Sequence, residues 1–238
     1  MKLTVLGMNG PFPAPGGATS GYLLQTERSA LVMDLGCGTL QRLTGLMAPE
    51  TADALLFSHW HYDHCSDVLP LLYRLQATGR HLTVYGPEDE SSPVRAVLAG
   101  DAAVTLRTVF PGDHLTIGDF DVQVFAARHP VPAVMYRAAA EGRTLCYTGD
   151  TNTVEGLAAF AQGADLLLAD GLFPEAGWAE QKPHLSAARC ARLAREAEAG
   201  RLVITHLNPL IPPEQLLREA QAIFPGCELA AEGRQYTV

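Results

Sequence analysis

Short apolar or alternating blocks recur along this chain, and glycine, proline, aspartate and asparagine separate them. Such blocks are typical of β-strands, because successive side chains of a strand point to opposite faces of the sheet. The pattern predicts the strands Leu3–Leu6, Gly21–Gln25, Ala30–Asp34, Ala54–Phe57, Leu82–Tyr85, Val104–Val109, Asp121–Ala126, Ala133–Ala138, Arg143–Tyr147, Asp165–Ala169 and Leu202–Thr205.

Apolar residues at helical spacing interrupt these strands and predict helices over Asp67–Ala77, Val154–Ala161, Ser186–Glu198 and Pro212–Phe224. The pair Gly118-Asp119 predicts a hairpin turn. A β-rich first part followed by β-α units indicates an α/β fold in which two sheets pack face to face and helices lie outside them.

The composition narrows the functions that need to be considered. The length of 238 residues fits one large domain, 1–238, or two small ones, and no linker divides the chain. Lys plus Arg is 17 and Asp plus Glu is 26, so the formal charge is 17 − 26 = −9. A chain this acidic is a poor ligand for long nucleic acid. No apolar run approaches the ~18–20 residues of a membrane span, and the first residues do not resemble a signal peptide. Five scattered cysteines indicate thiols that stay reduced, so we expect a cytoplasmic protein.

The segment from Ser58 to His64 carries the clearest chemical signal. It places His59, His61, Asp63 and His64 directly after an apolar strand. If the segment is extended, the first two histidines project to one face, because side chains alternate. The last two residues lie beyond the strand, where the chain bends. Imidazole and carboxylate are the ligands that zinc and similar ions accept. The segment therefore predicts two metal sites side by side.

Three more residues of ligand type stand directly after apolar strands: His129, Asp150 and His206. Taken alone, each is more often an ordinary polar residue at a strand end or in a turn. Beside the His59–His64 cluster, the metal reading becomes the better one, and all three could meet at one edge of the sandwich. His81 and His114 have no comparable setting, so we expect them to lie on the surface.

Together these residues resemble the pattern of the metallo-β-lactamase-fold hydrolases over essentially the whole chain. The resemblance implies a four-layer αββα sandwich with a binuclear metal site. It implies one metal on His59, His61 and His129, and a second on Asp63, His64 and His206. It further implies that Asp150 bridges the two metals, and that Asp34 supports the ligands from outside, although a plain turn carboxylate is the other reading of Asp34.

Within that family, the chain looks closer to the tRNase Z-like phosphodiesterases. His61 stands where flavodiiron-type relatives have glutamate, which disfavours a redox role. The segment after His129 and the segment His184-Leu185-Ser186 are similar to motifs of the tRNase Z-like branch. The resemblance implies that His184, with Asp170 behind it, handles a proton, although an exposed loop histidine is the other reading. The 150 − 129 = 21 residue separation leaves no room for a tRNA-gripping arm, so we do not expect tRNA maturation.

The function expected from the sequence is hydrolysis of a small, nucleotide-like or other phosphodiester by a metal-bridging hydroxide. We expect Asp63, His184 and Asp170 to act in catalysis, with two divalent ions, Zn²⁺ first and Mn²⁺ or Fe²⁺ as alternatives. Two other functions stay open: a lactone or thioester hydrolase with the same metals, and a non-catalytic metal-binding module. The expected partner is a small-molecule substrate, with no long nucleic acid and no membrane. A homodimer is the default expectation for assembly.

Overall fold

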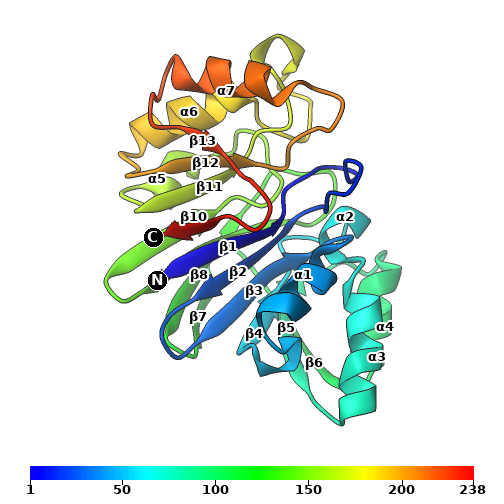
Figure 1. Ribbon diagram of the computed structural model, residues 1–238. Helices are drawn as coiled ribbons and strands as arrows, with labels where there is room; N and C mark the ends of the chain where they lie inside the picture. The colour runs from blue at the N-terminus through cyan, green and yellow to red at the C-terminus, as the bar shows by residue number, and fades with distance from the viewer.

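A computed structural model describes the whole chain, residues 1–238, as two β-sheets with helices outside them (Figure 1). The first sheet contains β1 (Lys2–Gly7), β2 (Gly21–Gln25), β3 (Ala30–Leu35), β4 (Ala54–Leu56), β5 (Leu82–Pro87), β6 (Val104–Val109) and β14 (Gln235–Thr237). Their order is β14-β1-β2-β3-β4-β5-β6. The pairs from β14 to β3 are antiparallel, and those from β3 to β6 are parallel.

The second sheet has the same plan. It contains β7 (His114–Ile117), β8 (Phe120–Ala126), β9 (Val134–Ala140), β10 (Arg143–Tyr147), β11 (Leu166–Asp170), β12 (Leu202–Thr205) and β13 (Glu228–Leu229), in the order β13-β12-β11-β10-β9-β8-β7. Strands β7 to β10 pair antiparallel, and β10 to β13 pair parallel. Parallel strands end at the same edge of a sheet, so the loops that follow them gather in one place.

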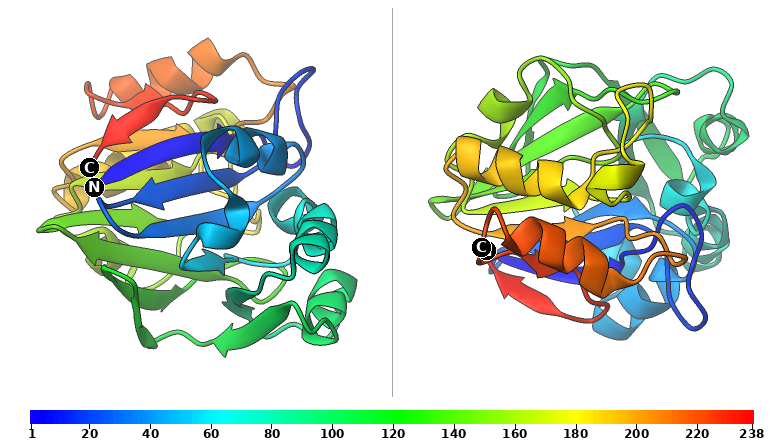
Figure 2. Two further views of the ribbon diagram at one scale, coloured as in Figure 1. Left: turned by 60° about the horizontal axis from the view of Figure 1, so that its bottom comes forward. Right: turned by 90° about the horizontal axis from the view of Figure 1, so that it is seen from above.

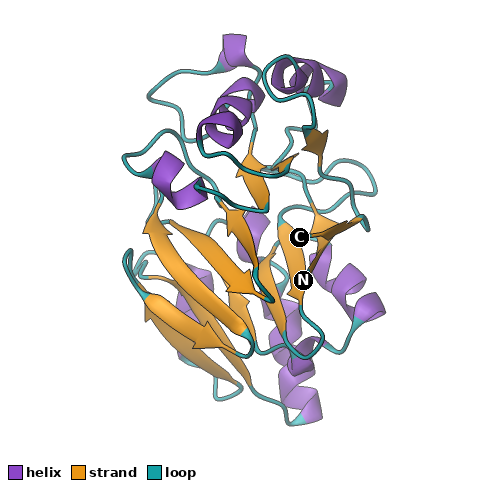
Figure 3. Ribbon diagram, turned by 90° about the vertical axis from the view of Figure 1, so that its left-hand side faces the viewer, coloured by secondary structure: helices purple, strands orange, loops and turns teal.

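Helices form the two outer layers (Figures 2 and 3). Those of the first sheet are α1 (Thr39–Leu46), α3 (Val68–Thr78) and α4 (Pro93–Ala99), and the short α2 (Tyr62–Cys65) lies beside them. Those of the second sheet are α5 (Leu157–Ala161), α6 (Ala187–Glu196) and α7 (Pro213–Gln221), and two 3₁₀ turns lie at Pro49–Thr51 and Glu175–Gly177. One apolar cluster fills the space between the sheets, and one lies beneath each helical layer. The expected four-layer αββα sandwich is confirmed.

Every strand predicted from the sequence is present in the structure, and no strand end is displaced by more than two residues. The predicted hairpin is also confirmed, since Ile117 pairs with Phe120 across Gly118 and Asp119. Helices α1 and α4, the short helix α2 and the edge strands β13 and β14 were missed. Helix α4 had a readable signal, because Ser92 caps it by accepting a bond from the Arg95 amide, and Pro93 opens its first turn.

The two chain ends lie together, because β14 pairs with β1 at the edge of the first sheet (Figure 1). The longest helix, α3, has 11 residues, and no helix combines the length and apolar character that a membrane crossing would require. All five cysteines are free thiols, as their scattered positions predicted.

Packing between the sheets should dominate stability. Leu145 of β10 is fully buried in the central cluster, whereas Leu210 is 78% exposed. We expect Leu145→Ala to lower the free energy of unfolding by about 2–5 kcal/mol, since it removes buried methyl groups and leaves a cavity. Leu210→Ala, the same chemical change on the surface, should cost less than about 0.5 kcal/mol. Urea unfolding of both variants measures the difference, and equal costs would contradict this account of the core.

Candidate metal centre

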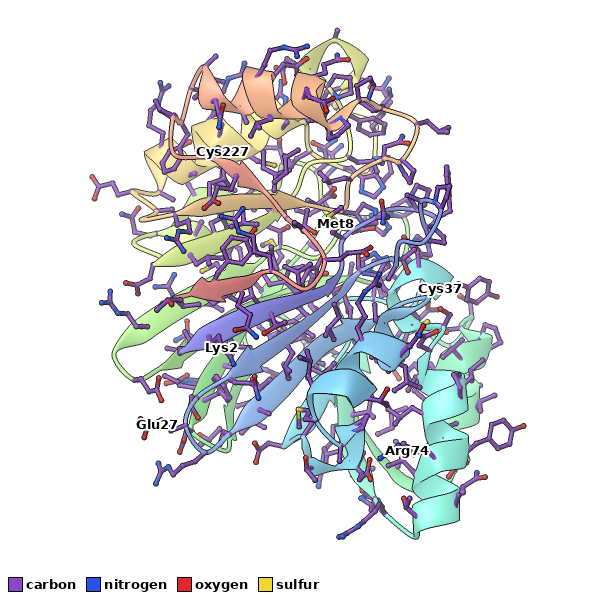
Figure 4. All side chains as sticks on the ribbon, in the orientation of Figure 1. Lys2, Met8, Glu27, Cys37, Arg74 and Cys227 are labelled. Atoms are coloured by element: carbon purple, nitrogen blue, oxygen red, sulfur yellow. The ribbon has the colours of Figure 1, made fainter.

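The candidate ligands lie at the end of the sandwich that is opposite the chain termini. Met8 and Cys37 mark this end in Figure 4, and Lys2 and Glu27 mark the other end. Ligand-type residues reach this end because each follows a strand. The segment with His59 follows β4, His129 follows β8, Asp150 follows β10 and His206 follows β12. The strand-end pattern in the sequence therefore predicted a real convergence.

The segment after β4 leaves the sheet before it reaches the histidines. β4 ends at Leu56, and the Ser58 amide donates to Asp34 Oδ1 at 2.7 Å and not to a neighbouring strand. His61, which precedes the first turn of α2, keeps extended backbone angles, φ −66° and ψ 148°. His59 and His61 face one point, as expected for an extended segment that ends in a turn.

The first group of ligand atoms comes from His59, His61, His129 and Asp150, and these atoms all lie within 4.8 Å of one another. His61 Nδ1 is 3.0 Å from His59 Nε2 and 3.1 Å from His129 Nε2. His129 Nδ1 faces the Pro183 carbonyl at 3.3 Å, so that nitrogen carries the proton and Nε2 presents a lone pair. Burial lowers the pKa of His129 to about 4 and that of His59 well below its ordinary value. Neutral imidazoles with converging lone pairs are what a cation requires.

The second group contains Asp63, His64, His206 and again Asp150. His64 Nε2 is 3.2 Å from Asp150 Oδ1, and His206 Nε2 is 3.3 Å from Asp150 Oδ2. One atom of each residue is buried without any hydrogen-bond partner, namely Asp63 Oδ2, His64 Nε2, Asp150 Oδ1 and His206 Nε2. Buried polar atoms are normally satisfied, because an unpartnered one costs about 1–3 kcal/mol. Four such atoms aimed at one point fit a bound cation.

Asp150 belongs to both groups. Its Oδ2 is also 3.6 Å from His59 Nε2, so the carboxylate lies between the two sets of histidines. Burial alone would raise the pKa of Asp150, but the histidines around it hold that pKa well below its ordinary range. An ionised, shared carboxylate is suited to join two cations.

Asp34 fixes the ligands from behind. Its Oδ2 accepts a 2.7 Å bond from His64 Nδ1 and a 2.6 Å bond from the Tyr147 hydroxyl. The Ser58 hydroxyl donates to the same oxygen at 2.8 Å and lies 3.0 Å from His59 Nδ1. Asp34 has a left-handed backbone, φ 56°, which is uncommon outside glycine and is held here by these bonds. One carboxylate thus orients a histidine of each group, and the reading of Asp34 as a plain turn residue was the weaker one.

His184 and Asp170 form a pair next to both groups. His184 Nδ1 donates to Asp170 Oδ2 at 2.7 Å, and its ring stacks on the His206 ring with centroids 5.0 Å apart. Burial would lower the pKa of His184, but the carboxylates of Asp170 and Asp150 raise it to about 9. Burial raises the pKa of Asp170 to about 6, although His184 opposes that rise. The raised pKa of His184 favours an imidazolium paired with the Asp170 carboxylate, and His184 is buried and not an exposed loop residue.

The loop that carries His184 is fastened by Asn152, which sequence reasoning missed. The Asn152 side-chain amide donates to the carbonyls of Lys182 at 2.6 Å and Ala179 at 3.1 Å. The Trp178 indole donates back to Asn152 Oδ1 at 3.1 Å. Because Asn152 follows Asp150 by two residues, the loop is anchored to the centre itself. Nothing in the sequence marks an asparagine for this role.

Other supporting residues were missed as well. The Ser20 hydroxyl lies 3.1 Å from His206 Nδ1, and a Cβ on Gly10 would overlap the His206 ring. Both come from the loop after β1, and their role depends on contacts that a sequence does not record. His81 and His114 lie far from the centre, as expected: His81 bonds Thr105, and His114 pairs with Asp121 on the surface.

Comparisons with known proteins agree with this geometry. Residues 33–207 match the family model described as "Beta-lactamase superfamily domain". The probable metallo-hydrolase YhfI of Bacillus subtilis is 32% identical over 95% of both chains, and its crystal structure superposes with a TM-score of 0.93 over 99% of this chain and 98% of that one. Ribonuclease Z of Methanopyrus kandleri is 28% identical over 98% of this chain and 96% of its own. The crystal structure of the short form of human tRNase Z shares the fold, with a TM-score of 0.81, 20% identity and 100% and 99% coverage. The chain belongs to the metallo-hydrolases of the beta-lactamase superfamily and resembles their tRNase Z-like branch.

Proposed function

We propose that this protein is a binuclear metal-dependent phosphodiesterase that acts on a small phosphodiester. The observation that carries the proposal is the position of Asp150, shared by two groups of ligand atoms, with the hydrogen-bonded pair of His184 and Asp170 beside it. A carboxylate between two sets of histidines suits two cations, and the histidine supplies a proton donor within reach of the same point.

In this proposal, His59, His61 and His129 would hold the first metal, Asp63, His64 and His206 would hold the second, and Asp150 would serve both. Zinc is the first choice because neutral imidazole and carboxylate are its usual ligands, and manganese or iron also suit such sites. When bound, the pair of ions activates a water molecule near neutral pH and stabilises charge on the phosphoryl oxygens.

The protein residues supply the remaining chemistry. Asp63 Oδ2 is turned into the centre without a protein partner, so it can hold a metal and orient the attacking water. His184, 3.8 Å from Asp150 through Nδ1, presents its other nitrogen to the substrate and donates a proton to the leaving oxygen. Asp170 keeps the ring in place and keeps it protonated.

Two features support a small phosphodiester as the substrate. The hairpin β9–β10 occupies most of the chain between His129 and Asp150, so no arm extends from this segment to bind a large RNA. The formal charge of −9 also disfavours a long polyanion. The ribonuclease Z relative is, by its name, an enzyme of phosphodiester cleavage, which supports the bond type and not the substrate size.

The direct test is an assay of the zinc-loaded protein against bis(p-nitrophenyl) phosphate and a panel of lactones and thioesters. We expect turnover of the diester. Faster turnover of a lactone or thioester would replace the proposal by the carboxyl-hydrolase reading, and no turnover of any ester would favour a non-catalytic metal-binding module.

Asp150→Ala should lower the metal content by at least one ion per chain. The substitution removes the carboxylate that both groups share and leaves histidines facing one another. Inductively coupled plasma mass spectrometry of the purified protein measures the content. Asp121→Ala, which removes an exposed carboxylate next to His114, is the matched control and should keep the wild-type metal content. Two ions retained in Asp150→Ala would remove the bridging assignment.

His184→Ala should keep the metal content and lower turnover. We expect a loss of about 10²–10⁴ in kcat for a diester with an alkoxide leaving group, the usual contribution of a general acid. The loss should be smaller for a p-nitrophenolate leaving group, which departs without a proton. Chromatography of the released monoester follows the first reaction, and absorbance follows the second. Equal losses for both leaving groups would contradict the proton-donor role.

Asp170→Asn should change the pH dependence. Asp170 raises the pKa of His184, and only the protonated ring can donate, so kcat should fall as pH rises through that pKa. Without the carboxylate the pKa of His184 is lower, and the fall should begin at lower pH. Asparagine can still accept the hydrogen bond from Nδ1, so the ring keeps its place. A pH profile of kcat that is the same as the wild type would assign Asp170 a purely structural role.

A further inference from the structure

A small pocket of about 230 Å³ opens directly beside His61, and the metal-centre chemistry described above makes no use of it. We call it the His61 pocket. Its lining comes from the start of α2, from the loop that joins β5 to α4, and from the loop after His129. Its lining residues are Trp60, His61, Tyr62, Asp89, Ser91, Ser92, Pro93 and Val131. Pockets for drug-sized molecules are about 300–1,000 Å³, so this one has room for one small substituent and not for a second nucleotide.

The pocket is built rigidly onto the metal-binding segment. The Trp60 indole donates to the Pro87 carbonyl at 2.7 Å and packs flat on Gly86. A Cβ on Gly86 would lie 2.6 Å from the Trp60 ring, so this close packing requires glycine. The β5–α4 loop, and Asp89 within it, is thereby held at a fixed position relative to His61.

Asp89 gives the pocket its chemical character. It is 8% exposed, and its Oδ1 accepts bonds from the Ser91 amide at 2.9 Å and the Ser91 hydroxyl at 2.6 Å. Its Oδ2 accepts no bond from the protein and is free to accept one from a ligand. No lysine or arginine lines the pocket, and His61 is the one lining side chain that could become cationic. The other walls are the rings of Trp60 and Tyr62 and the apolar Val131.

We propose that the His61 pocket binds one ester substituent of the phosphodiester and selects a small neutral or cationic group that bears an N–H or O–H donor, with Asp89 Oδ2 as the acceptor. This inference rests on the proposed function and adds the class of substituent to it. A substituent with a further phosphate or a carboxylate would meet the charge of the buried Asp89, and repulsion would disfavour it.

The test uses zinc-loaded full-length protein and p-nitrophenyl phosphodiesters that differ only in the second ester group. The groups are ethyl, 2-acetamidoethyl, 2-ammonioethyl, 2-(trimethylammonio)ethyl and 2-carboxyethyl. The acetamido and ammonio groups carry N–H donors with and without charge, and the trimethylammonio group carries charge without a donor. We expect kcat/KM to be at least tenfold higher for the two donor-bearing groups than for ethyl, and lower than ethyl for 2-carboxyethyl. Equal values across the series would overturn the proposal.

Asp89→Asn should then lower kcat/KM for the donor-bearing diesters by about ten- to a hundredfold, the loss expected for a hydrogen bond to a charged acceptor, and should leave the ethyl diester within about twofold. Glu88→Gln is the matched control. It removes the same charge from the neighbouring residue, which is 55% exposed and does not line the pocket, and should change nothing. Equal effects of both variants, or an equal loss for all diesters, would overturn the role of Asp89.

Val131→Lys provides a second, independent variant that leaves the Asp89 loop intact. A cation on the opposite wall should raise kcat/KM for the 2-carboxyethyl diester and lower it for the 2-ammonioethyl diester. An unchanged order would overturn the proposal.

If the wild type turns over no diester, the proposed function fails. Isothermal titration calorimetry of ligand binding then tests the pocket independently. Ethanolamine phosphate should bind the zinc-loaded protein at least tenfold more tightly than ethyl phosphate, and Asp89→Asn should abolish the difference. Equal affinities would overturn the pocket assignment.

Discussion

The structure depends on a group of lone pairs that face one another in a buried space. The nitrogens of His59, His61 and His129 approach within 3.0–3.1 Å, and four more nitrogen and oxygen atoms next to them have no partner. The unpartnered atoms make this arrangement costly, because burial removes the water that would otherwise bond them, although the histidines around Asp150 stabilise its carboxylate. The packing of two sheets holds the ligands in place, and a bound cation would recover the cost.

The two sheets are held together at this end by polar bonds as well as apolar packing. The Tyr147 hydroxyl of the second sheet donates to Asp34 of the first, and the hydroxyls of Tyr22 and Thr205 join at 2.7 Å. Asp34 therefore sets the position of both sheets and the orientation of His64. A buried network whose polar groups are all hydrogen-bonded favours one arrangement of the sheets over others. An apolar interface alone discriminates less well between such arrangements. The same hydrogen bonds of Asp34 consequently constrain both the geometry of the centre and the packing of the two sheets.

Local patterns explain how much could be predicted from the sequence. The strands and ligands could be found in the sequence because a short stretch of it is enough to recognise a β-strand that ends in a histidine or aspartate. Ser20, Tyr147 and Asn152 could not be found, because each acts on a residue distant in the chain and has no distinctive neighbours. The end of β4 at Leu56 has the same origin, because the Ser58 amide donates to Asp34, 24 residues away, and not to a neighbouring strand. Asp89 was missed because a lone acidic residue in a loop is ordinarily a solvated one, and only its burial beside His61 gives it meaning.

The site has two parts with opposite electrostatic preferences: the metal ligands, with cations bound, would favour an anion, and the His61 pocket would disfavour one. Cations bound at these ligands would attract an anion, whereas the Asp89 carboxylate, which shares a pocket with His61, would repel further negative charge. The effect of Asp89 reaches the centre, because burial lowers the pKa of His61 and the Asp89 carboxylate is among the charges that oppose this lowering. A polyanion such as RNA would gain binding free energy at the metals. It would lose binding free energy wherever a neighbouring phosphate lies against the acidic surface, because no basic arm is present to bind it. If the centre acts on a phosphodiester as proposed, repulsion around it would favour a single, isolated diester as much as attraction within it would.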